Sequence, residues 1–372
     1  MQLTKEEGIF SIYFLPLFVL KILDITAGNW ILKGMGASCV LIFFLCTLKT
    51  KYNIKIFRYF IWLLLYSMIL ILTTEKQGIF FSVVMLLSMY GIHNEQRIYK
   101  ICFISGSIFF LIACLANSSG SETTRYVNGE WVTMLKRSNL LFVSFIAVLC
   151  LYLFINKEHL GKKRILSLCV ISFFVYLYVG SRTGLLAICF LFASIILLQK
   201  QNIQKLLFVK YICLLFPLLC LLFCIYSGWQ YNNSPLLNIL DMVLQGRINQ
   251  NNAYLERYDI TLLGQPIYES TNADDYWVLD CAYMDMLICS GLLFTILWTI
   301  LNICAIRFFY KRNDMIEVSV LIMYALYGIT ETFLPNCFLN MSFFLFARYL
   351  YCTLSKKNKS VFISSYEQKR NY

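Results

Sequence analysis

Residues 139–155 read NLLFVSFIAVLCLYLFI, a run of seventeen residues that contains no charged side chain. A helix of this length and composition can cross the apolar interior of a bilayer, because it satisfies its backbone hydrogen bonds internally. The rest of the 372-residue chain has the same character, with 59% hydrophobic and only 14% charged residues. A soluble domain carries about a quarter charged residues. The composition therefore excludes an ordinary soluble globule, a disordered tail and a soluble nucleic-acid-binding protein.

Similar apolar runs recur along the chain and predict about twelve transmembrane helices. The predicted fold class is all-α, a polytopic integral membrane protein whose single domain covers residues 1–372. The first run has neither a purely basic leader nor a small-residue cleavage site, so we expect it to stay in the membrane. The predicted spans are Gly8–Asp24, Trp30–Leu48, Tyr59–Thr73, Gly78–Ile92, Ile101–Ala116, Asn139–Ile155, Ile165–Gly180, Thr183–Leu198, Leu206–Ser227, Ala282–Ile306, Met315–Ile329 and Phe338–Leu354.

The connections between these spans differ strongly in their Lys and Arg content. If the N-terminus is cytoplasmic, the inner connections hold 22 of the 32 basic residues and the outer connections hold eight, whereas Lys21 and Arg348 lie within spans. Cytoplasmic connections of membrane proteins are enriched in Lys and Arg, so both termini are predicted to be cytoplasmic. The net charge of +12 then follows from topology and from contact with anionic lipid, and no nucleic-acid partner is expected.

Two of the predicted outer connections are longer than turns. The first extracytoplasmic loop covers residues 117–138, and one large extracytoplasmic loop covers residues 228–281. Long loops in compact proteins usually carry function. Because the cytoplasmic connections are short and basic, we expect any chemistry to take place on the outer face.

The sequence lacks the motifs that hold common cofactors. It has neither a GxxxxGK[ST] nor a GxGxxG phosphate-binding motif, and its two His residues, His93 and His159, fall in predicted inner turns. Most of the fifteen Cys residues lie inside apolar runs, where they behave as small hydrophobic residues. We therefore expect no cofactor, no metal site and no disulfide framework.

The first candidate site is GSRTG at residues 180–184, which joins two apolar runs too close together for a broad loop. Arg182 thus begins a predicted membrane helix, and the flanking glycines allow another chain to approach closely. A guanidinium at this position suits a phosphate or diphosphate group at the bilayer surface. The alternative is an interfacial Arg that snorkels to lipid phosphate.

The large outer loop supplies a second group of charged residues. Arg247 and Arg257 are ten residues apart on a segment that is predicted to be helical, and LLG at residues 262–264 predicts a turn. Asp280 and Tyr283 then stand at the mouth of the next span. Cations and carboxylates on one surface suit a reaction with a diphosphate leaving group and a hydroxyl nucleophile. The alternative is a solvent-exposed loop whose charged residues are hydrated and have no functional role.

A third candidate lies between the last two spans. Glu331 ends one span, and Asn336 and Asn340 precede the final helix. A carboxylate here suits a general base or a sugar ligand. An interfacial carboxylate without a catalytic role is equally compatible with the sequence.

Taken together, these motifs resemble the O-antigen and capsule polymerase family (Wzy), which is related to the O-antigen ligases. The resemblance rests on the GSRTG-type helix start, the outer-loop pattern GR…Y…LLG…DxxY…SG and a late E…N…N. Arg125 and the segment 136–140 are similar to that family's first outer loop. Two positions depart from the pattern: Arg137-Ser138 replaces the usual His-Pro before Asn139, and Pro266 stands where a second loop Gly is common.

The resemblance implies a metal-independent glycosyltransferase at the outer face of the bacterial inner (cytoplasmic) membrane. It would join polyprenyl-diphosphate-linked oligosaccharide repeat units into O-antigen, capsule or exopolysaccharide, in contact with membrane lipid, a chain-length regulator and a flippase. Asp280, Glu331 and Arg182 would be catalytic. The residues expected to bind diphosphate or sugar are Arg125, Arg137, Asn139, Arg182, Arg247, Arg257, Tyr283 and Asn340.

Other functions fit the same hydropathy. A flippase or transporter of repeat units shares a twelve-span layout, but the spans here lack paired helices broken by Gly or Pro. An O-antigen ligase is expected to rely on an outer-face His, which this sequence does not have. A structural membrane scaffold is compatible with the hydropathy alone.

Overall fold

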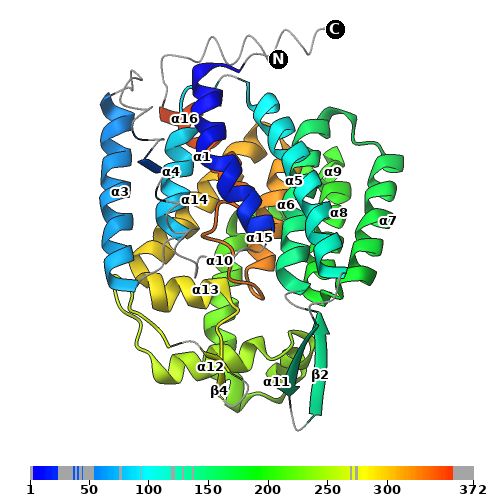
Figure 1. The fold of residues 1–372 in the computed structure, drawn as a ribbon, viewed down its shortest axis with the longest axis vertical. Coiled ribbons are helices and arrows are strands. Elements are labelled where there is room, and N and C mark those ends of the chain that lie inside the picture. The colour runs from blue at the N-terminus through cyan, green and yellow to red at the C-terminus, as the bar shows by residue number, and fades with distance from the viewer. Residues whose placement is uncertain are drawn as a thin grey trace.

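The computed structural model is a bundle of long helices that lie roughly along one axis, with shorter elements gathered at one end (Figure 1). It describes residues 3–23, 37, 40, 41, 44, 54–74, 78–92, 94–118, 122–127, 130–135, 138–268, 270–272 and 275–354. Most of this part of the chain is helical, which confirms the helical class expected from the apolar runs.

The helices follow one another closely along the chain. The longer ones are α1 (Lys5–Ile22), α3 (Ile54–Thr74), α5 (Glu95–Ser118), α6 (Ser138–Asn156), α7 (Lys162–Val179), α8 (Arg182–Leu198), α10 (Leu207–Gln230) and α14 (Gly291–Lys311). The shorter ones are α4 (Gly78–Ser88), α9 (Gln201–Gln204), α11 (Pro235–Val243), α12 (Arg247–Arg257), α13 (Ala282–Asp285), which continues into a π-helical turn at Met286–Ser290, α15 (Met315–Tyr327) and α16 (Ser342–Leu354). Two antiparallel hairpins pair β1 (Glu122–Val127) with β2 (Glu130–Leu135) and β3 (Ser270–Asn272) with β4 (Asp275–Trp277).

Four described helical segments are long and apolar enough to cross a membrane, as expected of a membrane-embedded protein. They are Glu95–Ala116, Asn139–His159, Leu207–Asn233 and Ala282–Lys311. The count of twelve spans and the orientation of the termini stay predictions. The predicted span Trp30–Leu48 lies largely outside the described residues.

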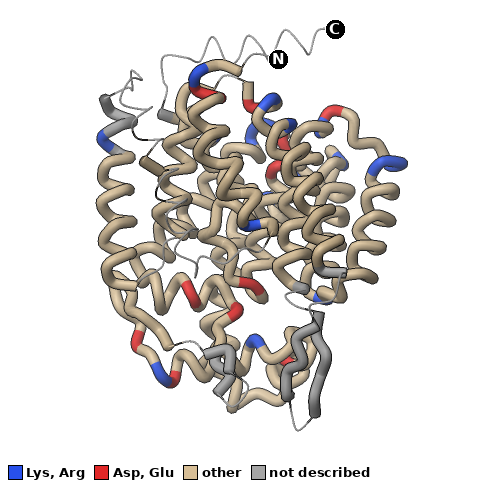
Figure 2. The backbone as a smooth tube through the Cα atoms, viewed as in Figure 1, with Lys and Arg blue, Asp and Glu red and all other residues tan. Residues whose placement is uncertain are grey.

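Charge is distributed unevenly between the two ends of the bundle. Figure 2 shows Lys and Arg concentrated at the end where α1 begins. The elements α11, α12, α13 and β2 lie at the opposite end (Figure 1). Both predicted extracytoplasmic loops, residues 117–138 and 228–281, therefore contribute to the same end of the molecule.

An irregular segment, residues 330–341, runs through the apolar interior between α15 and α16. The predicted span Phe338–Leu354 is therefore wrong at its start, because α16 begins only at Ser342. Non-helical backbone among apolar side chains must find hydrogen-bond partners within the protein. Side chains supply them: Ser82 Oγ donates to the Pro335 carbonyl (2.6 Å) and Tyr324 Oη donates to the Leu339 carbonyl (3.1 Å).

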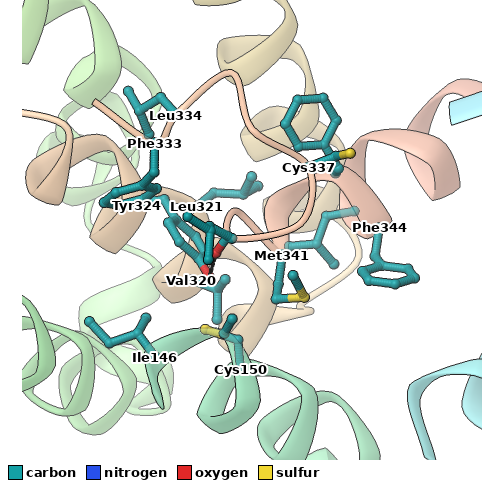
Figure 3. Close-up of a cluster of buried hydrophobic side chains, with 14 of the residues drawn as sticks. Ile146, Cys150, Val320, Leu321, Tyr324, Phe333, Leu334, Cys337, Met341 and Phe344 are labelled. Atoms are coloured by element: carbon teal, nitrogen blue, oxygen red, sulfur yellow. Dashed lines mark hydrogen bonds between the residues drawn. The ribbon is translucent and has the colours of Figure 1, made fainter. Parts of the chain in front are cut away.

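The same segment is fixed by apolar packing. Figure 3 shows Phe333, Leu334 and Cys337 of the segment in one cluster with Tyr324 of α15 and Cys150 of α6. All five side chains are buried. The irregular segment is thus part of the core, and it carries Glu331 at its beginning.

Two glycines anchor the segment after α12 to the start of α14. Gly264 and Gly291 both have a positive φ, +83° and +87° respectively, which L side chains rarely adopt. A Cβ on Gly264 would overlap the carbonyl oxygen of Cys289. The backbone N–H of Leu292 also donates to the Thr261 carbonyl at 3.0 Å. The backbone of the LLG motif, residues 262–264, therefore directly contacts the backbone of the SG motif, residues 290–291.

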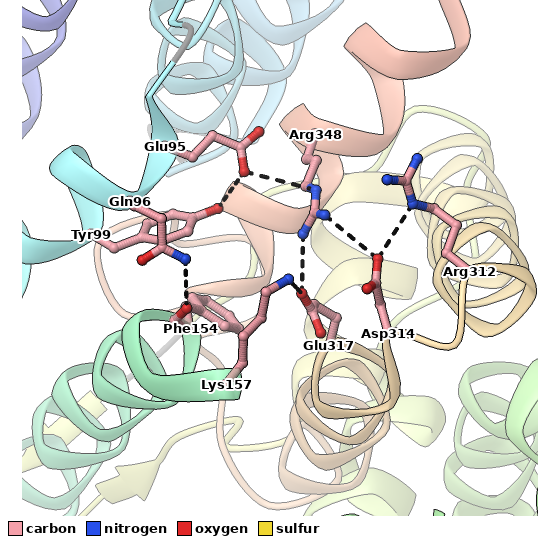
Figure 4. Close-up of polar contacts among 9 residues, drawn as sticks. All are labelled: Glu95, Gln96, Tyr99, Phe154, Lys157, Arg312, Asp314, Glu317 and Arg348. Carbon is pink, nitrogen blue, oxygen red and sulfur yellow. Dashed lines mark hydrogen bonds and ion pairs between the residues drawn. The ribbon is translucent and has the colours of Figure 1, made fainter. Parts of the chain in front are cut away.

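A buried ionic network lies near the basic end of the bundle (Figure 4). Arg348 Nη1 donates to Glu317 Oε1 (3.0 Å), and its Nη2 contacts Asp314 Oδ2 (3.5 Å). Lys157 Nζ also donates to Glu317 Oε1 (2.7 Å), and Arg348 Nε lies 3.8 Å from Glu95 Oε2. The network connects α5, the end of α6, α15 and α16, so Arg348 pairs inside the protein and does not snorkel to lipid.

The Gly264 contact predicts a clear stability effect. Gly264→Ala should lower the free energy of unfolding by about 1–3 kcal/mol, because it adds backbone strain and a clash with Cys289. Thermal unfolding of the purified protein in detergent measures the loss. Gly161→Ala is the matched control, since nothing lies within 4 Å of its Cβ. Equal melting temperatures for the two variants would show that the contact is not formed.

The ionic network generates a second prediction. Arg348→Met should cost about 3–5 kcal/mol of stability, because it leaves buried carboxylates without their main cation. Arg164→Met removes an exposed Arg at the same end of the bundle and should change little. Thermal unfolding of both variants is the measurement. A fully stable Arg348→Met protein would contradict the assigned pairing.

Candidate functional site

The start of α8 is built by the GSRTG sequence. Gly180 ends α7 in the left-handed conformation (φ +79°), and the Ser181 hydroxyl accepts the backbone N–H of Gly184 as the N-cap of α8. A Cβ on Gly184 would overlap the ring of Phe142 on α6. The two glycines therefore allow a sharp reversal and a close helix contact, and the first N–H groups of α8 lie at the end of the bundle that holds α12.

Helix α12 is capped by a carboxylate from α11. Its N-cap is Gly246, which has no side chain, and Asp241 Oδ1 accepts the backbone N–H groups of Ile248 (2.7 Å) and Asn249 (3.2 Å) instead. A negative charge at a helix N-terminus is stabilising. This cap fixes the first turn of α12 and with it Arg247, which is only 9% exposed.

Arg247, at the start of α12, forms an ion pair with Asp280, near the end of the long 228–281 segment. Its Nη1 donates to Asp280 Oδ2 and also to Gln250 Oε1 (3.3 Å). Asp280 is held in place because the backbone N–H of Ala282 donates to the Gly328 carbonyl at 2.9 Å. The start of α13 is thereby attached to the end of α15, three residues before Glu331.

Glu331 stands beside this ion pair. The pKa of its carboxyl is raised to about 8: burial is the main cause and the Asp280 charge adds to it, whereas Arg247 and the Thr183 hydroxyl oppose the rise. The carboxyl group is therefore mostly protonated at neutral pH. Thr183 belongs to the first turn of α8, so the start of α8, the start of α12 and the irregular segment meet at Glu331.

Two buried polar atoms of this group are available for further bonding. Arg247 Nε and Glu331 Oε1 are shielded from solvent and have no hydrogen-bond partner among the residues that the structure describes. Buried polar atoms are almost always bonded in proteins, so each such exception requires an explanation. The Arg247 guanidinium can donate its unused hydrogen bond to an anionic group. The Glu331 carboxylate, once ionised, can accept a proton from a hydroxyl.

The structure thus brings together three residues that the sequence singled out: Arg247, Asp280 and Glu331. Arg182, the first residue of α8, is exposed and has no hydrogen bond or ion pair in the described part of the chain. Arg257 lies at the far end of α12, where its guanidinium packs over the rings of Tyr258 (5.8 Å) and Tyr268 (5.6 Å).

The remaining predicted site residues lie elsewhere or are bonded within the fold. Tyr283 Oη donates to the Ala325 carbonyl (2.9 Å), and Asn340 Nδ2 donates to the Leu334 carbonyl (2.8 Å) while its Oδ1 accepts the Ser342 hydroxyl (2.6 Å). Both side chains hold helices and the irregular segment in place. Asn139 is the second residue of α6, Arg125 is a residue of β1 whose side chain is not described, and Arg137 lies outside the described residues.

Three neighbours of Glu331 were not singled out from the sequence. Thr183 contacts its carboxyl, and Tyr327 lies close enough for the Glu331 charge to act on the phenol, with Ser181 beside it. The sequence did offer a sign of Ser181 and Thr183, because these two hydroxyl residues flank Arg182 at a predicted helix start. Tyr327 carried no signal, because it sits in an apolar run.

Comparisons with protein-family models, with curated proteins and with solved structures give no match to this chain.

The electrostatics of the site can be tested directly. Asp280→Asn should lower the pKa of Glu331, because it removes a nearby negative charge, and Arg247→Gln should raise it, because it removes a positive one. Infrared titration of the protonated-carboxyl stretch, assigned with Glu331→Gln, measures the midpoint, which should be about 8 in the unaltered protein. Midpoints that do not move in opposite directions in the two variants would show that the three groups are not neighbours.

Proposed function

We propose that this protein is a repeat-unit polymerase that joins polyprenyl-diphosphate-linked oligosaccharides at the outer face of a bacterial inner membrane. The observation that carries the proposal is Glu331, a half-buried residue whose Oε1 is shielded and unbonded and whose pKa is about 8, beside the Arg247–Asp280 ion pair. The resemblance of the sequence motifs to the Wzy family points to the same reaction. The long apolar helices are those of a membrane-embedded protein, and a lipid-linked substrate also resides in a membrane.

The leaving group of this reaction is a lipid diphosphate. Arg247 offers an unbonded Nε at the site, and the exposed Arg182 stands at the positive N-terminus of α8. Guanidinium groups and helix N-termini both stabilise phosphate oxygens. A diphosphate already leaves readily, so fixed positive groups can supply the transition-state stabilisation.

Glu331 is the better general base of the two carboxylates. Asp280 already accepts a hydrogen bond from the Arg247 guanidinium, so its Oδ2 is occupied. Glu331 has a pKa of about 8, close to the operating pH. A base with such a pKa is partly ionised and still binds a proton strongly. A hydroxyl oxygen of the acceptor sugar attacks the anomeric carbon of the donor glycan. The bond from that carbon to the diphosphate oxygen breaks, the lipid diphosphate departs with the electron pair, and the hydroxyl proton passes to Glu331.

The arrangement also suits the location of the substrate. The candidate site lies at the end of the bundle that carries α11 and α12, opposite the basic end (Figures 1 and 2). Basic residues concentrate on the cytoplasmic side of membrane proteins, so this end faces outward in the proposal. A flippase that delivers lipid-linked units and a chain-length regulator would then be the functional partners.

The proposal predicts the effect of Glu331→Gln on glycan length. Polymer formation should fall by about a hundredfold to ten-thousandfold, the usual contribution of a general base. The measurement is the glycan size ladder of a strain that lacks the gene and is complemented with each variant. Glu256→Gln on the exposed side of α12 is the control, since it retains the oxygen that accepts from Asn232. In vitro, kcat/KM should rise with pH through about 8, because only the ionised carboxyl accepts a proton.

The deletion strain separates the rival functions. A polymerase defect leaves surface glycan that ends after one repeat unit. A flippase defect traps lipid-linked units inside the cell, and a ligase defect leaves polymer that is not attached to its final acceptor. Either of the last two phenotypes, or a normal ladder with Glu331→Gln, would refute the proposed reaction.

A further inference from the structure

Helix α10 carries a stripe of exposed apolar side chains along its whole length. They recur every three or four residues and occupy one face: Tyr211, Leu215, Leu219, Leu222, Tyr226 and Trp229. The distance from Phe208 to Trp229 along a helix is about 31 Å, which matches the ~30 Å apolar thickness of a bilayer. Aromatic residues stand at both ends of the stripe, where membrane proteins place them. The lipid boundary at this end therefore lies close to Trp229.

Helix α11 begins only six residues after Trp229, following one short turn at Tyr231–Asn233. Four of its side chains are apolar and more than half exposed: Leu236, Ile239, Met242 and Val243. Leu237 and Asp241 occupy the opposite, buried face. Asp241 is the only charged residue of the helix, so the exposed side carries no charge, and the exposed Asn238 lies at the edge of the four apolar side chains.

We propose that α11 is an interfacial helix whose exposed apolar face is immersed in the lipid leaflet that surrounds the end of α10. We assign lipid as the occupant of this face because α11 follows the aromatic end of the α10 stripe, Tyr226 and Trp229, after only one short turn. An amphipathic helix at this depth lies in the plane of the interface with its apolar side toward the acyl chains. This contact is independent of the reaction proposed above.

The same helix sets the depth of the candidate site. Asp241 connects α11 to α12, because its side chain caps Ile248 and Asn249 and its carbonyl accepts the Gly246 N–H (2.9 Å). Arg247 lies between these bonded residues. Immersion of α11 in the interface therefore holds the Arg247 guanidinium at the level of the lipid headgroups.

Photo-crosslinking tests the lipid contact in the full-length protein. A diazirine amino acid is introduced at Ile239 or Met242, and at the exposed Asn238 on the polar edge as a control, in nanodiscs of phosphatidylcholine and phosphatidylglycerol. Mass spectrometry should find several-fold more lipid adducts at Ile239 and Met242 than at Asn238. Equal lipid yields at the three positions, or adducts mainly to protein, would overturn the proposal.

Hydrogen exchange tests the link from α11 to the site. A double variant, Ile239→Asp with Met242→Asp, should speed exchange of the Ile248 and Asn249 amides in nanodiscs, because it weakens immersion of the helix that supplies their cap. Asn238→Asp is the control, and α14 should exchange at its normal rate in both proteins. Unchanged exchange at the start of α12 in the double variant would refute the proposed control of depth.

Discussion

Non-helical backbone can persist inside an apolar bundle only where the protein bonds its N–H and C=O groups. Residues 330–341 meet this condition through Ser82, Tyr324 and Asn340, whose side chains bond the backbone of the segment. Much of the architecture depends on that arrangement. It ends α15 early, delays the start of α16 and holds Glu331 next to elements that are distant in the sequence. The polar groups that hold the segment are therefore a precondition of the site, although they take no part in its chemistry.

The site itself arises from two helix starts that lie beside one half-buried carboxyl, that of Glu331. Helix α12 begins with Arg247 because Asp241 caps its first turn, and hydroxyl residues flank Arg182 at the start of helix α8, one of which, Thr183, contacts Glu331. The ion pair between Arg247 and Asp280 neutralises the second carboxylate. One guanidinium and one titratable carboxyl remain with unbonded atoms at the same place. This is a small set of groups for a transferase, and it suits a reaction in which the substrate already carries a good leaving group.

Local pattern was enough to predict the helices but not their assembly. Apolar runs located most of the helices, and the helix at Arg247–Arg257 was expected. The start of α16 was misplaced because Phe338, Leu339 and Met341 are apolar yet lie in turns, a state that periodicity does not reveal. The convergence of Arg247, Asp280 and Glu331 depends on long-range backbone contacts, such as the one between Ala282 and Gly328. Likewise, a pattern of residue types could not show that the side-chain amide of Asn340 is hydrogen-bonded within the protein, to Leu334 and Ser342.

The elevated pKa of Glu331 links its protonation to whatever charge stands next to it. Any anion placed beside the carboxyl increases its affinity for a proton, so binding of such a ligand is accompanied by proton uptake. In the proposed transfer, negative charge builds on the diphosphate as its bond to the sugar breaks. The basicity of Glu331 therefore grows during the same step in which the acceptor hydroxyl must lose its proton, and bond cleavage and deprotonation reinforce each other through the electric field alone.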